Sequence, residues 1–142
     1  MVYVLDACAL LSYLHDEDGS DIVEGLLKEA VNGDAAIYMS IVNLAEVHYV
    51  NIRGLGPERA AEMLGQVHAA PIQVIADISE AVFQHATKLK ASYKCSLADA
   101  IGIATVVELS GYFVSSDHHE LEAIAENESI PFLWLPPHPK VR

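Results

Sequence analysis

The sequence is poor in cysteine, in long apolar runs and in basic residues, and each shortage excludes a class of protein. Its 142 residues include two cysteines, Cys8 and Cys95, which provide neither a disulfide framework nor the spacing of a zinc site. The scarcity of cysteine favours a reduced, cytoplasmic setting. No apolar run reaches the ~18 residues that a membrane-spanning helix requires, so we expect no membrane association.

Basic residues are outnumbered by acidic ones. Eight Lys and Arg stand against 20 Asp and Glu, which gives a formal net charge of −12. This balance argues against a protein that holds duplex nucleic acid on a broad basic face. It leaves room for an enzyme that contacts a few phosphates through a metal ion and a small local patch.

The hydrophobic content of 52% is enough for a full core, and the length favours one domain. We predict this domain over residues 1–135, followed by an extended, proline-rich tail over 136–142. Apolar β-branched runs alternate with helical periods, which predicts an α/β fold with a mainly parallel sheet of four to five strands. Strands are expected at 2–5, 36–39, 71–75, 112–114 and, as an edge strand, 131–135; helices are expected at 7–14, 21–31, 41–53, from 57 onward, 79–93, 96–109 and 117–125.

Four acidic residues stand out because their surroundings are apolar. Asp6 closes the run Val2–Leu5, Glu46 and Asp99 are each the only charge in a long segment, and Asp117 follows a chargeless stretch. An isolated carboxylate in such surroundings is costly unless something pairs with it. A shared metal ion would satisfy all four, and oxygen ligands favour hard ions such as Mg²⁺ or Mn²⁺.

The predicted sheet gives these acids a common location. Asp6 and Asp117 each follow a predicted strand, and Glu46 lies less than two turns into the helix after another strand. In open parallel sheets, ligands bind at the carboxyl ends of the strands. We therefore expect Asp6, Glu46 and Asp117 on one rim, which Asp99 can join if its helix begins there.

Each acid also has an ordinary structural interpretation. Asp6 and Asp117 could cap the helices that follow them, and Asp99 could close a capping box with Ser96. Glu46 points away from a predicted core stripe formed by Ile41, Leu44, Ala45 and His48, but its own side of the helix is apolar as well, with Val42, Tyr49 and Val50. It is therefore expected to be partly buried, and it either faces a metal or pairs with a cation such as Arg53. His118 and His119 beside Asp117 could contact substrate or alter metal preference, or simply occupy the surface.

Four segments resemble the motifs of PIN-domain ribonucleases. Val4-Leu5-Asp6-Ala7 resembles the family's opening strand with its aspartate, and Ser40 to Val47 resembles the helix that carries a glutamate. Leu97 to Ala104 is similar to the central helix with its aspartate, and Ser115-Ser116-Asp117 is similar to the family's "T-x-D". In length and layout the chain resembles the toxin subunit of a VapBC-type toxin–antitoxin pair.

The resemblance implies a PIN-like three-layer fold and a Mg²⁺- or Mn²⁺-dependent endoribonuclease. Asp6, Asp99 and Asp117 would bind the metal, and Glu46 would act on the attacking water. Ser115, Lys94 and Arg53 would position the RNA, although Lys94, Lys88 and Lys90 could equally form a solvated helix face. A cognate antitoxin and a homodimer are the expected partners. The alternative is a degenerate PIN-like protein-binding module without catalysis.

Overall fold

The strands form one parallel sheet in the centre of the molecule. A computed structural model describes residues 1–137, so most of the predicted tail, 138–142, lies outside the described residues. The strand order is β3-β2-β1-β4-β5, and all four neighbouring pairs are parallel. The strands are β1 (Val2–Leu5), β2 (Ala36–Ser40), β3 (Gln73–Ile75), β4 (Tyr112–Ser115) and β5 (Phe132–Trp134).

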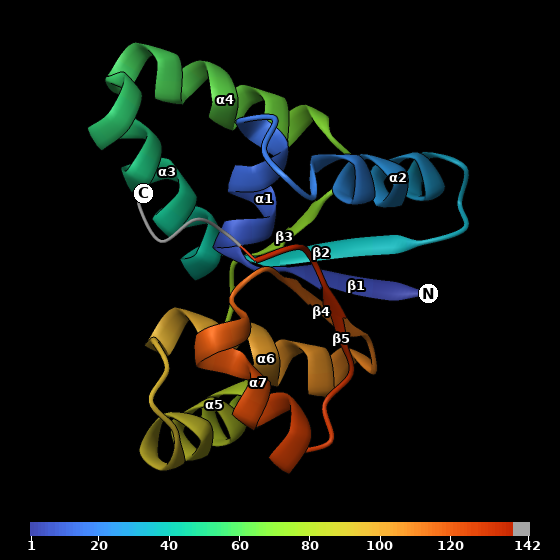
Figure 1. Cartoon of the computed structure of the whole chain (residues 1–142), viewed down its shortest axis with the longest axis vertical. Helices are drawn as coiled ribbons and strands as arrows, with labels where there is room; N and C mark the ends of the chain where they lie inside the picture. Colours follow the sequence, from blue (N-terminus) through green and yellow to red (C-terminus); the bar gives the residue numbers. More distant parts are fainter. Residues whose placement is uncertain (138–142) are drawn as a thin grey trace.

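Helices cover both faces of this sheet, which confirms the predicted three-layer α/β architecture (Figure 1). One layer contains α1 (Ala7–Leu14), α2 (Ser20–Val31), α3 (Ile41–Leu55) and α4 (Pro57–Ala69). The other layer contains α5 (Glu80–Ser92), α6 (Leu97–Leu109) and α7 (His118–Asn127). All these elements fall within the predicted domain range 1–135, although that domain boundary itself stays a prediction.

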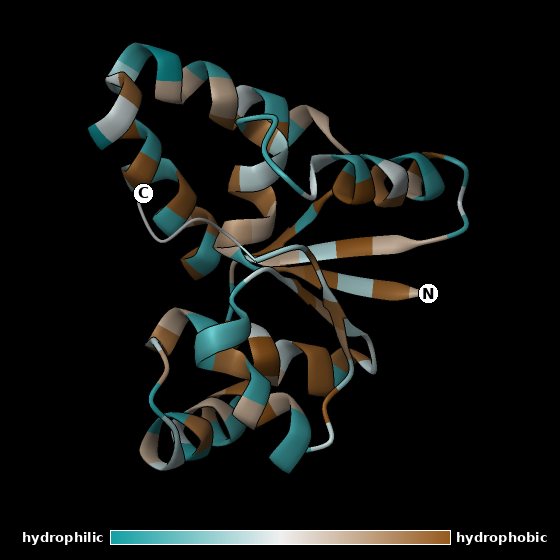
Figure 2. Ribbon diagram, in the orientation of Figure 1, coloured by the Kyte–Doolittle hydropathy of each residue, from teal (hydrophilic) through white to brown (hydrophobic). Residues whose placement is uncertain are grey.

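The central strand β1 separates two apolar cores. Tyr3 and Leu5 pack with the helices α1 to α4, whereas Val4 packs with α5, α6 and α7. This division follows from the two-residue period of a strand, which sends successive side chains to opposite faces. Brown, apolar stretches on the helices accordingly face the sheet in Figure 2. None of the helices within residues 1–137 has the length and apolar composition needed to cross a lipid bilayer.

The buried face of α3 differs from the predicted stripe. Ile41 is 43% exposed and Ala45 is also exposed, while Asn43, Val47 and Asn51 join Leu44 in the interior. The predicted core stripe was wrong because it was drawn from the apolar residues, whereas two asparagines occupy the core side of this helix. Asn51 is stabilised there by the His15 Nε2 atom, 2.7 Å from its Oδ1.

Helix α6 approaches the sheet and α3 closely at Gly102. A methyl group added there would lie 2.8 Å from Phe113 Cε1 and 2.9 Å from Asn43 Oδ1. Both distances are shorter than ordinary van der Waals contact, so only a residue without Cβ fits. This close approach holds the start of α6, with Asp99, near the carboxyl ends of the strands.

Candidate active site

The site lies where the chain order reverses across the sheet. From β1 the chain runs to β2 and β3 on one side, and β4 and β5 lie on the other side. Asp6 follows β1 and Asp117 follows β4, and the Asp6 N–H donates to the Val114 carbonyl oxygen at 3.1 Å. Ligand sites of open parallel sheets are found at such switch points.

Asp6 is the most deeply buried of the four acids, with a side-chain and backbone exposure of 1%. Its Oδ1 accepts a hydrogen bond from Ala9 N at 2.7 Å and so caps α1, as the structural interpretation predicted. Burial raises the pKa of Asp6 to about 8, with further contributions from the charges of Asp99 and Asp117. Hydrogen bonds from Ser115 and Ala9 oppose this rise without cancelling it.

Asp99 occupies the first turn of α6 and faces the same region. The Ser96 Oγ accepts from Asp99 N at 3.0 Å, so the predicted cap is present. Burial raises the pKa of Asp99 to about 6, and a hydrogen bond to Ser96 opposes the rise. The negative charges of Glu46, Asp117 and Glu120 raise it further. Such mutual effects require that these carboxyl groups lie close together.

Glu46 is half-buried on α3, as expected. Burial raises its pKa, and the charge of Asp117 adds to the effect. The alternative pairing with Arg53 is not formed: no ion pair joins the two in the part of the chain that the structure describes. The Arg53 guanidinium instead lies over the Tyr49 ring, 5.1 Å from its centroid.

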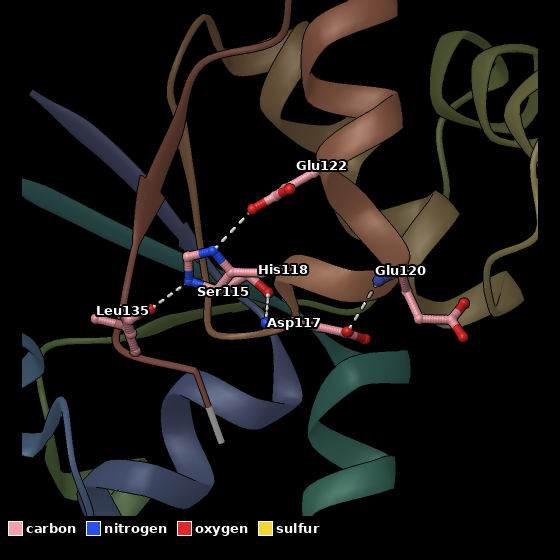
Figure 3. A network of polar contacts seen from close by, with 6 residues as sticks. All are labelled: Ser115, Asp117, His118, Glu120, Glu122 and Leu135. Carbon is pink, nitrogen blue, oxygen red and sulfur yellow. Dashed lines mark hydrogen bonds and ion pairs between the residues drawn. The ribbon is translucent and has the colours of Figure 1, made fainter. Parts of the chain in front are cut away.

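Asp117 connects the sheet to α7. Its carboxylate accepts from Glu120 N at 3.2 Å and caps that helix, while its own N–H donates to Ser115 Oγ at 3.0 Å (Figure 3). Ser115 is fully buried and its hydroxyl also bonds to the Asp6 carboxyl. The Ser115 side chain therefore links the two acids that flank the switch point.

Asp6 and Asp117 thus act as helix caps and also belong, with Glu46 and Asp99, to one cluster of interacting carboxyl groups. Besides burial, the negative charge of at least one other member of the cluster raises the pKa of Asp6, of Glu46 and of Asp99. Within residues 1–137, however, no three His, Cys, Asp or Glu side chains are oriented closely enough to enclose a metal ion. Asp6 and Asp117 each direct one carboxylate oxygen toward a backbone N–H at the start of a helix.

Lys94 and Arg53, the two basic residues predicted to position RNA, are exposed on segments that border the cluster. Lys94 lies in the loop before α6, and Arg53 lies in the last turn of α3. Both ring nitrogens of His118 already have partners. Nε2 lies 2.7 Å from the Leu135 carbonyl oxygen and Nδ1 lies 3.1 Å from Glu122 Oε1, so neither nitrogen is available to a metal ion. His119 is exposed.

Sequence reasoning missed several polar residues around the cluster. Glu120 is one of them, because its negative charge raises the pKa of Asp99. Asn43 and Ser116 are buried, and in the described part of the chain Asn43 Nδ2, Asn43 Oδ1 and Ser116 Oγ have no hydrogen-bond partner. Ser116 could have been noted from its place between Ser115 and Asp117, but nothing in the sequence indicated the burial of Asn43.

The model of the PIN domain family matches residues 3–127, and the chain belongs to this family. The structure is similar to VapBC2 from Rickettsia felis bound to a DNA fragment from its promoter (TM-score 0.72, 15% identity, 95% of this chain and 99% of that one). It is also similar to DNA-bound VapBC from Salmonella typhimurium (TM-score 0.71, 16% identity, 94% and 97%). The sarcin–ricin loop cleaving toxin VapC20 from Mycobacterium tuberculosis matches with a TM-score of 0.60 and 14% identity, over 87% and 95%. No curated protein matches the sequence.

Proposed function

We propose that this protein is a divalent-metal-dependent endoribonuclease and the toxin of a toxin–antitoxin pair. The observation that carries the proposal is the convergence of Asp6, Glu46, Asp99 and Asp117 at the sheet's switch point. Membership of the PIN domain family supports it. The likeness to VapBC structures and to an RNA-cleaving toxin is consistent with it.

The residues fit Mg²⁺ or Mn²⁺ by their chemistry. The cluster offers carboxylate oxygens, which hard ions prefer. Without a cation, burial opposes the ionisation of these carboxyl groups and their mutual repulsion adds to it, which is the origin of the raised pKa values of Asp6 and Asp99. Asp6, Asp99 and Asp117 are the proposed ligands, and Asp6 and Asp117 would turn toward the ion from their capping orientations. A bound ion would supply charge that stabilises the phosphodiester as negative charge builds on it and would make water a better nucleophile.

The chain's own residues would carry out the remaining steps. Glu46 is proposed to orient the attacking water and to accept its proton as the water oxygen bonds to phosphorus and the ribose oxygen leaves. Its raised pKa brings it closer to the working range of a general base. Ser115 is proposed to act beneath the site by orienting Asp6 and Asp117, since its burial removes it from direct contact with RNA.

Lys94 and Arg53 are proposed to guide RNA phosphates to the cluster. Both are exposed, and the structure gives neither an ion-pair partner within the described residues. With a net charge of −12, such local cations matter because the rest of the surface repels RNA.

The proposed partners are an antitoxin, a second copy of this chain and the RNA substrate, all met in the cytoplasm. A basic side chain of an antitoxin would complement the acidic cluster. Exposed apolar side chains on α3, namely Ile41 (43%), Tyr49 (48%), Ile52 (39%) and Leu55 (43%), offer a surface for a dimer or for the antitoxin.

The decisive test is cleavage of a labelled single-stranded RNA with Mg²⁺ or Mn²⁺ and then with excess EDTA. We expect cleavage with either ion, none in EDTA, and none by Asp6→Asn or Asp99→Asn. Asp77→Asn is the matched control because Asp77 is exposed in the loop after β3. Cleavage that persists in EDTA and in both site variants would refute the mechanism.

One observation favours a second candidate, a PIN-like protein-binding module without catalysis. Asp6 and Asp117 already serve as helix caps, so these two acids have a structural role that requires no metal. Calorimetric titration separates the candidates, because a module of this kind would show no Mn²⁺ binding at millimolar concentration.

A further inference from the structure

The loop that carries Asp117 is attached at both ends to one residue of the neighbouring strand segment. Before Asp117, the Ser115 carbonyl oxygen accepts from Leu135 N at 2.8 Å. After Asp117, His118 Nε2 donates to the Leu135 carbonyl oxygen at 2.7 Å. Figure 3 shows the imidazole of His118 reaching from the start of α7 to Leu135. Two hydrogen bonds to the backbone of a single residue thus restrain residues 115–118.

Leu135 is a rigid anchor for this attachment. It is 1% exposed and packs in the core formed by α1 to α4. Its Cβ also lies against the turn before α2, where a side chain added to Gly19 would come within 3.2 Å of it. Gly19 has a φ of +93°, which disfavours any larger residue there. The anchor is therefore held by a part of the fold that is independent of α7.

Stacking fixes the orientation of the histidine ring. The His118 and Trp134 rings stack with centroids 4.4 Å apart, and Trp134 stacks on Phe132 at 4.6 Å. Phe132 in turn meets Phe113 of β4 edge to face at 5.3 Å. This aromatic column runs from the sheet core to the imidazole, so the direction in which Nε2 points is determined by packing as well as by its hydrogen bond.

We propose that His118 is a positioning residue: by binding the Leu135 backbone it holds the loop 115–118, and with it the Asp117 carboxylate, in the orientation that the acidic site needs. The consequence for metal binding rests on the proposed function. The bond to Glu122 contributes little to this role, because Glu122 is 57% exposed at its side chain and exposed ion pairs are weak.

The direct test is amide hydrogen exchange of metal-free protein, followed by NMR. The Glu120 N–H reports the position of Asp117, because its acceptor is Asp117 Oδ1. We expect His118→Ala to accelerate exchange at Glu120 by about tenfold. The Ala9 N–H, which bonds to Asp6, is the internal control and should change less than twofold. Unchanged exchange at Glu120, or equal acceleration at both amides, would overturn the proposal.

Two further variants separate positioning from general loss of structure. His118→Gln keeps an N–H donor at a position similar to Nε2 and should restore most of the protection at Glu120. Glu122→Gln removes only the exposed contact and should leave exchange unchanged. If His118→Gln exchanges as fast as His118→Ala although both variants are folded, the hydrogen bond to Leu135 does not hold the loop and the proposal fails.

Metal affinity provides a second readout. Loss of a residue that orients a metal ligand typically costs 10- to 100-fold in affinity, so His118→Ala should weaken Mn²⁺ binding by about tenfold. In an Asp117→Asn background the same substitution should cost less than twofold, because its effect passes through Asp117. Equal losses in the two backgrounds would overturn the proposal. A wild type that binds no Mn²⁺ would refute the proposed function instead, and the exchange experiment would then decide the role of His118.

Discussion

Asp6→Asn should stabilise the metal-free protein while abolishing its activity. Asn caps a helix as well as Asp, so the bond to Ala9 can be kept. Burial and the neighbouring acids raise the pKa of Asp6 to about 8 from 3.8. The folded protein therefore retains a proton that the unfolded chain releases, and stability falls as pH rises from about 4 to about 8.

The magnitude follows from this interval. Between the ordinary pKa of about 4 and pH 7 lie about 3 pH units, and each unit lowers the free energy of unfolding by about 1.4 kcal/mol. The raised pKa of Asp6 therefore costs the folded wild-type protein up to about 4 kcal/mol at pH 7. Asn removes this loss because it does not ionise. The free energy of unfolding of Asp6→Asn in EDTA should exceed that of wild type by up to about 4 kcal/mol at pH 7 and by up to about 2 kcal/mol at pH 5.

Urea denaturation followed by circular dichroism at pH 5, 6, 7 and 8 would measure the difference. Asp77→Asn, an exposed control, should match wild type at each pH. Added Mn²⁺ should then stabilise wild type, by about 3 kcal/mol at a hundred times the dissociation constant, but not Asp6→Asn. A variant that is less stable than wild type at pH 8 in EDTA, or a difference independent of pH, would refute the argument that Asp6 is a strained buried acid.

Three other predictions test other parts of the molecule. Glu46→Gln should lower the single-turnover cleavage rate by about 100-fold or more, since Glu46 is proposed to act on the attacking water. The Mn²⁺ affinity of this variant, measured by calorimetry, should change only a few-fold. A parallel loss of Mn²⁺ affinity would instead make Glu46 a metal ligand. Gly102→Ala should lower the free energy of urea unfolding by about 1–3 kcal/mol, because the new methyl group would meet Phe113 and Asn43; unchanged stability would contradict the close packing. Replacing Lys88, Lys90 and Lys94 together by Gln should weaken RNA binding and flatten its dependence on salt, as measured by fluorescence anisotropy; an unchanged slope would remove these lysines from the RNA-binding surface.

The sequence was sufficient for the order of elements because the signals there are local. The buried run Val2–Leu5 and the cap at Ser40 each depend on a few adjacent residues, and the structure places a strand and a helix start there. The rim that holds Asp6 and Asp117 followed from parallel topology, since both residues end adjacent strands.

Contacts between distant segments could not be predicted in the same way. The inward face of α3 contains Asn43 and Asn51, whose burial depends on packing partners that local hydrophobicity does not reveal. The bond between His118 and Leu135 joins residues 17 positions apart through a side chain and a carbonyl group, and no sequence pattern indicates it. The Ser115 hydroxyl contacts both Asp6 and Asp117. This shared contact also depends on the fold and could not be predicted from the sequence.

The attachment of the Asp117 loop to Leu135 also has a consequence during protein synthesis. A nascent chain that has emerged only as far as residue 127 already contains all four acids and α7, but it lacks β5 and Leu135, to whose backbone Ser115 and His118 bind. The four acids would then be present without the restraint on Asp117. The loop that carries Asp117 would therefore reach its final arrangement only after β5 and Leu135 had emerged.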